Sequence, residues 1–166
     1  ITEQKNPVFI IKIFYELLRR ENKFKLIWIG NGNLKERIIK MCSELKISDK
    51  VIFINETDCT NKYYCSMDAF LLPSSYEGLG IVFVEAQASG LRTYASTNVP
   101  QDVKITDLIK FLAPKDEKKW ADSIICGRNT VPNRKKYNKE VKKSIFYNNK
   151  DRNELMEFYD FVMEGE

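Results

Sequence analysis

The chain has 166 residues, enough for one ordinary domain, and its 43% hydrophobic and 12% aromatic content can supply a substantial core. Its formal net charge is only +4, from 27 basic and 23 acidic residues, so the composition indicates no nucleic-acid partner. Because the chain contains no histidine, Ser-His and Cys-His catalytic dyads and mixed Cys/His zinc sets are excluded. We therefore expect no metal site, and any chemistry must use carboxylates, amines, hydroxyls or backbone amides.

The cysteines and the chain start indicate where the protein resides. Cys42, Cys59, Cys65 and Cys126 form no CxxC pair and are expected to be free thiols in a reducing cytosol. No segment approaches the roughly 20 apolar residues of a membrane span, and the opening ITEQKNP lacks the order of a signal peptide. The absence of an initiator Met predicts that the chain begins inside a longer protein. These features together predict a cytoplasmic location.

The first half of the chain alternates helical and strand patterns. Asn6 and Pro7 are typical of a helix start, and apolar residues follow at helical spacing as far as Leu18. Residues 25–30 predict a buried strand, residues 31–47 an amphipathic helix, and residues 50–54 a second strand. Residues 60–67 predict a short helix and residues 68–73 a third strand.

The second half continues the alternation. We expect a helix over residues 80–89, closed by Gly90, although its run from Ile81 to Val84 also has strand propensity. Strands at 92–96 and 107–113, a helix at 115–127, and one or two helices within 134–166 follow. Uniformly apolar strands separated by helices predict a doubly wound α/β domain with a parallel sheet covered on both faces. Residues 1–166 are expected to form one such domain.

Parallel sheets of this kind bind ligands at the carboxyl ends of their strands. The loops there are 30–32, 55–60, 73–80 and 96–100. The loop PSSYEGLG at 73–80 opens a helix, so Gly78 and Gly80 would let backbone amides approach a phosphate. Glu77 lies in this loop, and Glu85 lies roughly 8 Å further along the helix at 1.5 Å per residue. Two acids at this separation are suited to gripping two parts of one extended ligand, such as a sugar and a ribose; the alternative is a solvated pair.

The segment PSSYEGLGIVFVEAQASG resembles the donor-site signature of the retaining glycosyltransferases of family 4. That signature is two acids eight positions apart in the context P-S-x-x-E-G-[FL]-G-x-x-x-x-E-A-x-A-x-G. Matching positions in this chain are Pro73, Ser74, Glu77, Gly78, Leu79, Gly80, Glu85, Ala86, Ala88 and Gly90. ITEQKNP and the KLIWIGNGNLKERIIK segment are similar to the opening of the nucleotide-binding domain in bacterial capsular and exopolysaccharide members, and the resemblance covers residues 1 to about 125.

The resemblance implies the Rossmann-like C-terminal half of a GT-B glycosyltransferase, without the N-terminal acceptor domain and without the first strand of its own sheet. It assigns Lys5 to the donor diphosphate, Glu77 to the transferred sugar and Glu85 to the ribose. It also assigns the amides of Gly78, Leu79, Gly80 and Ile81 to the phosphates, and places Gly30 and Gly32 near the nucleotide. Arg92, where the family usually has Pro, and the segment STNVPQDVKIT depart from the pattern and leave the contacts of the 97–106 loop to the donor sugar open.

From the resemblance we expect transfer of a hexose or N-acetylhexosamine from a nucleotide-diphospho-sugar, with UDP favoured, to a glycan or lipid-linked glycan precursor of the cell surface. The full-length protein would need neither metal nor other cofactor, and this chain alone would be inactive. The alternatives are a synthase acting on a small soluble sugar and a non-catalytic nucleotide-sugar-binding module that scaffolds a partner transferase. The basic segment RKKYNKEVKKSIFY at 134–147 is favoured as a packed helix, with a peripheral contact at the inner face of the membrane as the alternative.

Overall fold

The computed structural model describes residues 1–128, 130 and 132–144. Its described strands form two parallel ladders, in agreement with the predicted α/β class. The first joins β1 (Leu26–Ile29) to β2 (Val51–Ile54), and the second has the order β3 (Ala69–Leu72), β4 (Arg92–Ser96), β5 (Ile109–Leu112). Each strand lies at the position that the sequence predicts. The part of the predicted tail beyond residue 144 lies outside the described residues.

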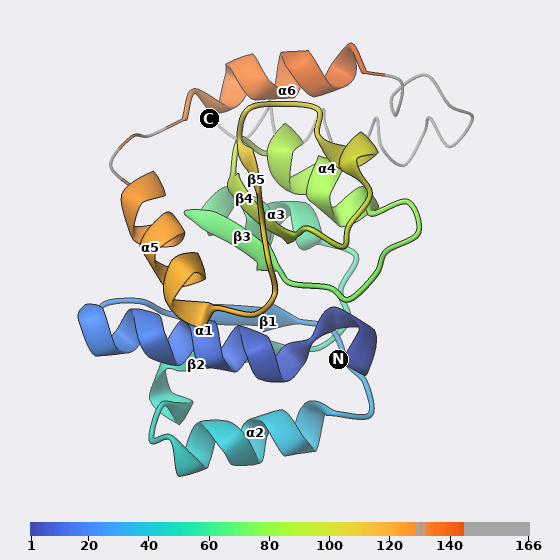
Figure 1. Cartoon of the computed structure of the whole chain (residues 1–166). Coiled ribbons are helices and arrows are strands. Elements are labelled where there is room, and N and C mark those ends of the chain that lie inside the picture. Colours follow the sequence, from blue (N-terminus) through green and yellow to red (C-terminus); the bar gives the residue numbers. More distant parts are fainter. Residues whose placement is uncertain (129, 131, 145–166) are drawn as a thin grey trace.

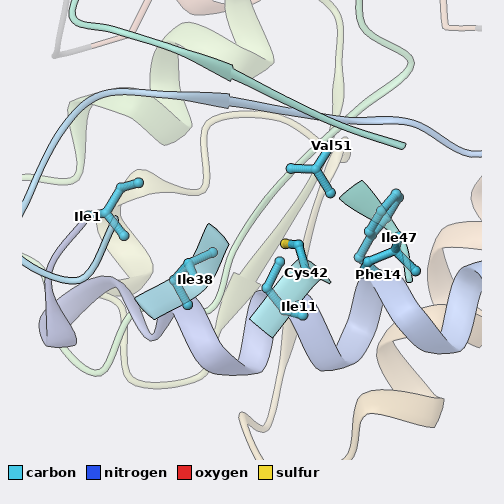
Figure 2. Packing of buried hydrophobic residues seen from close by; sticks show 7 residues of the cluster. All are labelled: Ile1, Ile11, Phe14, Ile38, Cys42, Ile47 and Val51. Carbon is cyan, nitrogen blue, oxygen red and sulfur yellow. The ribbon is translucent and has the colours of Figure 1, made fainter. Parts of the chain in front are cut away.

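Helix α1 (Pro7–Arg20) holds the two ladders together by burying two of its faces (Figure 1). Ile11 and Phe14 belong to the core around β2 and α2 (Lys35–Glu44), which Figure 2 shows at close range. Ile13 and Leu17 belong to a second core that contains the fully buried Trp120 of α5 (Glu117–Gly127). Because α1 is apolar on two sides, it packs into both cores and connects them.

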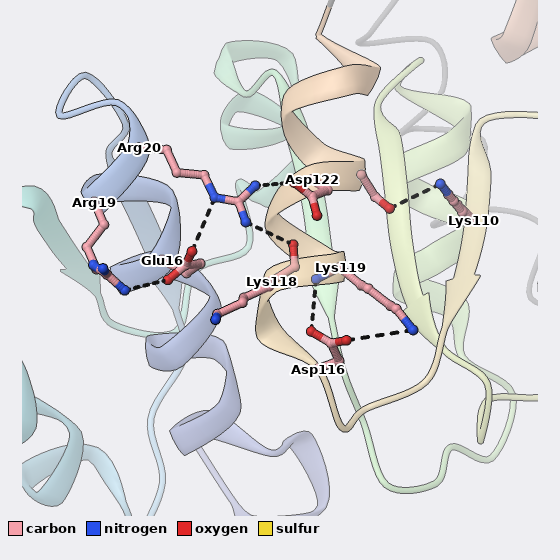
Figure 3. A network of polar contacts seen from close by, with 9 residues as sticks. Glu16, Arg19, Arg20, Lys110, Asp116, Lys118, Lys119 and Asp122 are labelled. Atoms are coloured by element: carbon pink, nitrogen blue, oxygen red, sulfur yellow. Dashed lines mark hydrogen bonds and ion pairs between the residues drawn. The ribbon is translucent and has the colours of Figure 1, made fainter.

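Polar contacts fasten the carboxyl end of α1 to α5, as Figure 3 shows. The guanidinium of Arg20 donates to the carboxylates of Glu16 and Asp122 and to the carbonyl oxygen of Lys118. These groups lie at the edge of the interface, where ion pairs contribute little free energy individually. The buried apolar contacts therefore hold the two helices together, and the polar rim fixes how they are aligned.

Helix α4 (Ile81–Ala88) is buried on most of its surface. Phe83, Val84 and Ala86 are each at most 1% exposed, and α6 (Arg134–Lys142), of the basic segment, covers the helix with Val141 buried. The β-branched run at its start nevertheless forms a helix, because packing against β4 and α6 overrides local strand propensity. The elements before it are α3 (Thr60–Ser66) and the 3-10 turns η1 (Glu3–Lys5) and η2 (Ser48–Lys50), and η3 (Gln101–Val103) follows β4. Sequence reasoning did not predict the three 3-10 turns.

Among the described residues, no helix is both long enough and apolar enough to cross a lipid bilayer. Cys42 is buried, whereas Cys59, Cys65 and Cys126 are exposed, and all four are free thiols as the sequence predicts. Burial also raises the pKa of the Cys42 thiol.

Candidate functional site

The turn η1 brings Lys5 to the loop at 73–80, which lies some seventy positions later in the chain. The amide of Ser75 donates to the carbonyl oxygen of Gln4 at 2.8 Å, and the Gln4 side chain donates to the carbonyl oxygen of Tyr76 at 3.1 Å. Asn6 then adopts a left-handed conformation with φ of 52°, and Pro7 begins α1. Asn6 thus occupies the predicted cap position, but it turns the chain through its backbone instead of capping through its side chain.

Glu77 is the centre of this loop. Its two carboxylate oxygens accept hydrogen bonds from the Lys5 ammonium at 2.7 and 2.9 Å, and the Ser74 hydroxyl donates to Oε1 at 2.6 Å. The Glu77 side chain is only 7% exposed, whereas that of Lys5 is 35% exposed. These charged and hydroxyl donors satisfy the oxygens of a largely buried carboxylate. The structure therefore brings together the residues that the resemblance assigns to the donor diphosphate and to the transferred sugar, and it adds Ser74, whose role the signature did not specify.

The two glycines of the loop have different local requirements. Gly80 precedes α4 with φ of 63°, and a Cβ there would lie 2.9 Å from Val103 Cγ1, so the chain itself requires glycine at this position. At Gly78 a Cβ would meet only open space. Between them Leu79 is 72% exposed, and Ile81 at the helix start is 42% exposed. The amino end of α4 is thus an accessible helix terminus, where backbone amides without intrahelical partners suit an anion.

Glu85 lies further along α4 and contacts α3. The hydroxyl of Tyr64 donates to Glu85 Oε2 at 3.3 Å. Burial raises the pKa of Glu85, and the hydrogen bond from Tyr64 opposes that rise. Burial and the nearby Glu85 charge raise the pKa of Tyr64, so the phenol remains a hydrogen-bond donor. Sequence reasoning gave Tyr64 no role at the site, because isolated aromatic residues are most often part of the core.

A buried side chain links α4 to the loop that departs from the family pattern. The amide nitrogen of Gln87 donates to the carbonyl oxygens of Phe83 and Val103, at 2.9 and 2.7 Å. Its oxygen accepts from the backbone amides of Ile105 and Thr106, and from the Thr106 hydroxyl. Since Val103 also packs where a Cβ of Gly80 would lie, Gln87 fixes the 97–106 loop beside the start of α4.

The loop at 30–32 has partners of its own. Gly30 and Gly32 have positive φ angles of 113° and 152°, and the Gly30 amide donates to the carbonyl oxygen of Ile54 at 3.0 Å. The Lys35 ammonium donates to the side-chain oxygens of Asn31 and Asn55, at 2.9 and 2.8 Å, so it joins the loops that follow β1 and β2. The carbonyl oxygen of Asn31 also accepts from the amino group of Ile1, so this loop is tied to β2, to Lys35 and to the first residue. Lys5 and Glu77 meet at the loop before α4, and Glu85 lies further along that helix.

Comparison with known proteins indicates the family of the chain. The family model for glycosyl transferases group 1 matches residues 1–143. The putative glycosyltransferase EpsF of Bacillus subtilis is 34% identical over 101 residues, which are 61% of this chain and 26% of that protein. The O-antigen biosynthesis glycosyltransferase WclY of Escherichia coli is 30% identical over 97 residues, or 58% and 27% of the two chains. The chain therefore spans about a quarter of the length of these relatives.

Solved structures show the same fold at lower identity. A variant of S. aureus TarM, in complex with fondaparinux, alpha-GlcNAc-glycerol and UDP, has a TM-score of 0.72 and 21% identity, over 99% of this chain and 32% of that chain. The C-terminal domain of the group 1 glycosyl transferase LpcC from Francisella tularensis has a TM-score of 0.65 and 17% identity, over 99% of this chain and 80% of that chain. The match to the family model covers most of the chain, and the chain belongs to the glycosyl transferases group 1 family.

Proposed function

We propose that this chain is the donor-binding half of a retaining glycosyltransferase that transfers a hexose or N-acetylhexosamine from a UDP-sugar. The observation that carries the proposal is the meeting of Lys5 and Glu77 beside the amino end of α4. One cation, one largely buried carboxylate and free helix amides suit a negatively charged diphosphate that carries a sugar rich in hydroxyls.

In the proposed reaction the bond between the anomeric carbon and the diphosphate oxygen breaks, and a hydroxyl oxygen of the acceptor forms the new bond to that carbon. The leaving diphosphate takes the electron pair of the broken bond, so negative charge develops on it, and the proton of the acceptor hydroxyl passes to it. The Lys5 ammonium has three hydrogen-bond donors, of which two go to Glu77, so the third is available to a phosphate oxygen. With the amides at the start of α4, it would stabilise the developing charge without a proton donor and without a metal. Glu77 would accept hydrogen bonds from hydroxyls of the transferred sugar, and Glu85 from the ribose.

The ligands bound in related structures and the name of one relative support the choice of donor and acceptor. The TarM variant and Anabaena HepE were both solved with UDP, which favours UDP over GDP and ADP. WclY is named for O-antigen biosynthesis, which favours a surface-glycan precursor as the acceptor. We assign acceptor binding to a further domain of the full-length protein, which would act in the cytoplasm, at the inner face of the membrane where the acceptor is lipid-linked.

The sheet supports the same assignment. Among the described strands, β1 pairs only with β2, and β3 only with β4, so each has a backbone edge available for another strand. A strand that precedes residue 1 and joins the two ladders would complete a single parallel sheet. Such a strand would end near η1, which begins at Glu3 and contains Lys5.

The test is calorimetric titration of UDP, GDP and ADP into this chain and into a Glu85→Ala variant. We expect UDP to bind preferentially, and the variant to lose about 1–3 kcal/mol of binding free energy, because a hydrogen-bonding charged group is removed. Equal binding of all three nucleotides would contradict the assignment of UDP. Turnover of UDP-sugars by the full-length protein would then separate a transferase from a scaffold that binds donor without reacting.

A further inference from the structure

Tyr64 lies where it can hold the carboxylate of Glu85. Its ring is buried in a small core with Ala86 and Leu91, and it contacts the ring of Phe70 edge to face at 5.8 Å. A phenylalanine would make the same ring contacts, so packing does not account for the hydroxyl. The hydroxyl instead donates to Glu85 Oε2, the acid that the proposed function assigns to the ribose.

The two helices that carry these groups are joined at their carboxyl ends by one side chain. The Arg134 guanidinium donates to the carbonyl oxygens of Tyr64 and Met67 at the end of α3, at 3.2 and 2.7 Å. It also donates to the carbonyl oxygen of Ser89 at the end of α4, at 3.0 Å. A cation that caps two helix ends opposes any sliding of one helix along the other. Arg134 therefore fixes how α3 lies against α4 at their carboxyl ends, and with it the separation of Tyr64 and Glu85.

A carboxylate must be ionised and correctly turned to accept hydrogen bonds from two neighbouring hydroxyls. Burial of Glu85 works against ionisation, whereas a hydrogen bond from a neutral hydroxyl favours the ionised form. When Tyr64 occupies Oε2, Oε1 and the second lone pair of Oε2 remain to accept hydroxyls. The contact thus orients Glu85 without using up its capacity as an acceptor.

We propose that Tyr64 is a positioning residue for the ribose of the nucleotide: it holds the Glu85 carboxylate so that the site prefers a ribonucleotide with both ribose hydroxyls. This inference rests on the proposed function, since it takes Glu85 as the ribose ligand. In this role Tyr64 acts on the nucleotide through the Glu85 carboxylate, to which its hydroxyl donates.

The test compares the affinities of UDP and 2′,3′-dideoxy-UDP for the wild-type chain and for Tyr64→Phe. We expect the wild type to bind UDP at least tenfold more tightly than the dideoxy nucleotide. In Tyr64→Phe the affinity for UDP should fall about three- to tenfold, while the affinity for the dideoxy nucleotide stays unchanged. Tyr63→Phe is the matched control, because it removes a hydroxyl from the adjacent tyrosine of the same helix, and it should leave the ratio of affinities unchanged.

Together with Tyr64→Phe, the Glu85→Ala variant and the variant that carries both substitutions form a double-mutant cycle. If Tyr64 acts through Glu85, removing its hydroxyl in the Glu85→Ala background should change the UDP affinity less than twofold. A Tyr64→Phe chain that keeps the wild-type ratio, or that loses affinity for both nucleotides equally, would overturn the positioning role alone. A wild-type chain that does not distinguish the two nucleotides would instead overturn the proposed role of Glu85, and the inference with it.

Discussion

The two ends of helix α4 are built in opposite ways. At the carboxyl end Gly90 has a left-handed backbone, and its amide donates to the carbonyl oxygen of Gln87 at 2.9 Å. The amide of Leu91 donates to the carbonyl oxygen of Ala86, also at 2.9 Å. This is a Schellman motif, in which the end of the helix satisfies its own carbonyls. Arg134 satisfies the carbonyl of Ser89 as well. At the amino end, by contrast, Leu79 and Ile81 are exposed, and the amide of Phe83 donates to the carbonyl oxygen of Gly80 at 3.0 Å.

The difference separates groups that maintain the fold from groups that are available to a ligand. A helix end whose polar groups are paired within the chain contributes to stability, and changes there should reduce the free energy of unfolding. At the amino end, changes at exposed loop positions such as Gly78 should mainly affect binding, whereas Gly80 is required by its left-handed backbone and by its packing against Val103. Variants at the two ends of one short helix can therefore test this division directly.

The largest effect is expected for Arg134→Met. The substitution keeps much of the aliphatic stem but removes a part-buried guanidinium that donates to three carbonyl oxygens. Because hydrogen bonds to charged groups are strong, we expect the free energy of unfolding in urea to fall by about 3 kcal/mol. Lys139→Met, on the exposed side of the same helix, is the control and should change stability by less than about 0.5 kcal/mol. Equal effects of the two substitutions would show that Arg134 does not clamp the helix ends.

Gly90→Ala should have the next largest effect. Gly90 has φ of 68°, and a Cβ there would lie 2.6 to 2.9 Å from atoms of Arg134. The left-handed conformation and the crowding should together lower the free energy of unfolding by about 2 kcal/mol. In an Arg134→Ala background the contact with Cγ is removed, but Cα and Cβ of residue 134 remain at 2.7 and 2.9 Å, so the same glycine substitution should keep most of its cost. A cost that vanishes in this background would place the strain in the Cγ contact alone.

Gly78→Ala should change binding and leave stability nearly unaltered. Within the chain a Cβ at this position meets nothing, so the free energy of unfolding should stay within about 0.5 kcal/mol of the wild type. If a diphosphate approaches this backbone closely, the added methyl should weaken UDP binding about tenfold, which calorimetry would measure. Gly80→Ala, two positions later, should instead lower the free energy of unfolding, because that glycine is left-handed and packed against Val103. UDP affinity unchanged by Gly78→Ala would move the phosphates away from this loop.

The sequence predicted most of the fold, because the strands are apolar runs and the helices carry periodic apolar residues between clear stop signals. It also predicted where α4 starts and ends, since glycines mark both ends. The three 3-10 turns could not be predicted from such patterns, because they are too short to show a periodicity. The turn η1 matters most, since it carries Lys5 to the loop that contains Glu77.

The candidate site was only partly visible in the sequence. The spacing of Glu77 and Glu85 was informative, whereas their partners were not. Ser74 belongs to the same motif, but nothing in the motif tells which carboxylate its hydroxyl contacts. Tyr64 and Arg134 act through contacts made across 21 and 45 to 70 positions, which depend on how α3, α4 and α6 pack. Long-range polar contacts of this kind follow from tertiary packing and leave no local pattern.

Glu85 lies between the two ends of α4, and its contribution to stability should depend on pH. Burial raises the pKa of this carboxyl in the folded chain above its value of 4.5 in the unfolded chain, so the folded chain holds the proton more tightly. The stabilisation that this proton provides is complete below pH 4.5 and is lost as the pH rises through the folded pKa.

A Glu85→Gln variant cannot ionise, so its stability relative to the wild type should rise between pH 4.5 and neutral pH, as urea unfolding across this range would measure. The same variant should bind UDP more weakly at neutral pH, because a neutral amide replaces the ionised acceptor. In the wild type, UDP affinity should fall as the pH is lowered through the raised pKa of Glu85. A variant that is less stable than the wild type at neutral pH would mean that the ionised carboxylate supports the fold. If ionised Glu85 strengthens UDP binding but lowers the free energy of unfolding, its role is in binding the ligand, as is proposed for the amino end of the helix.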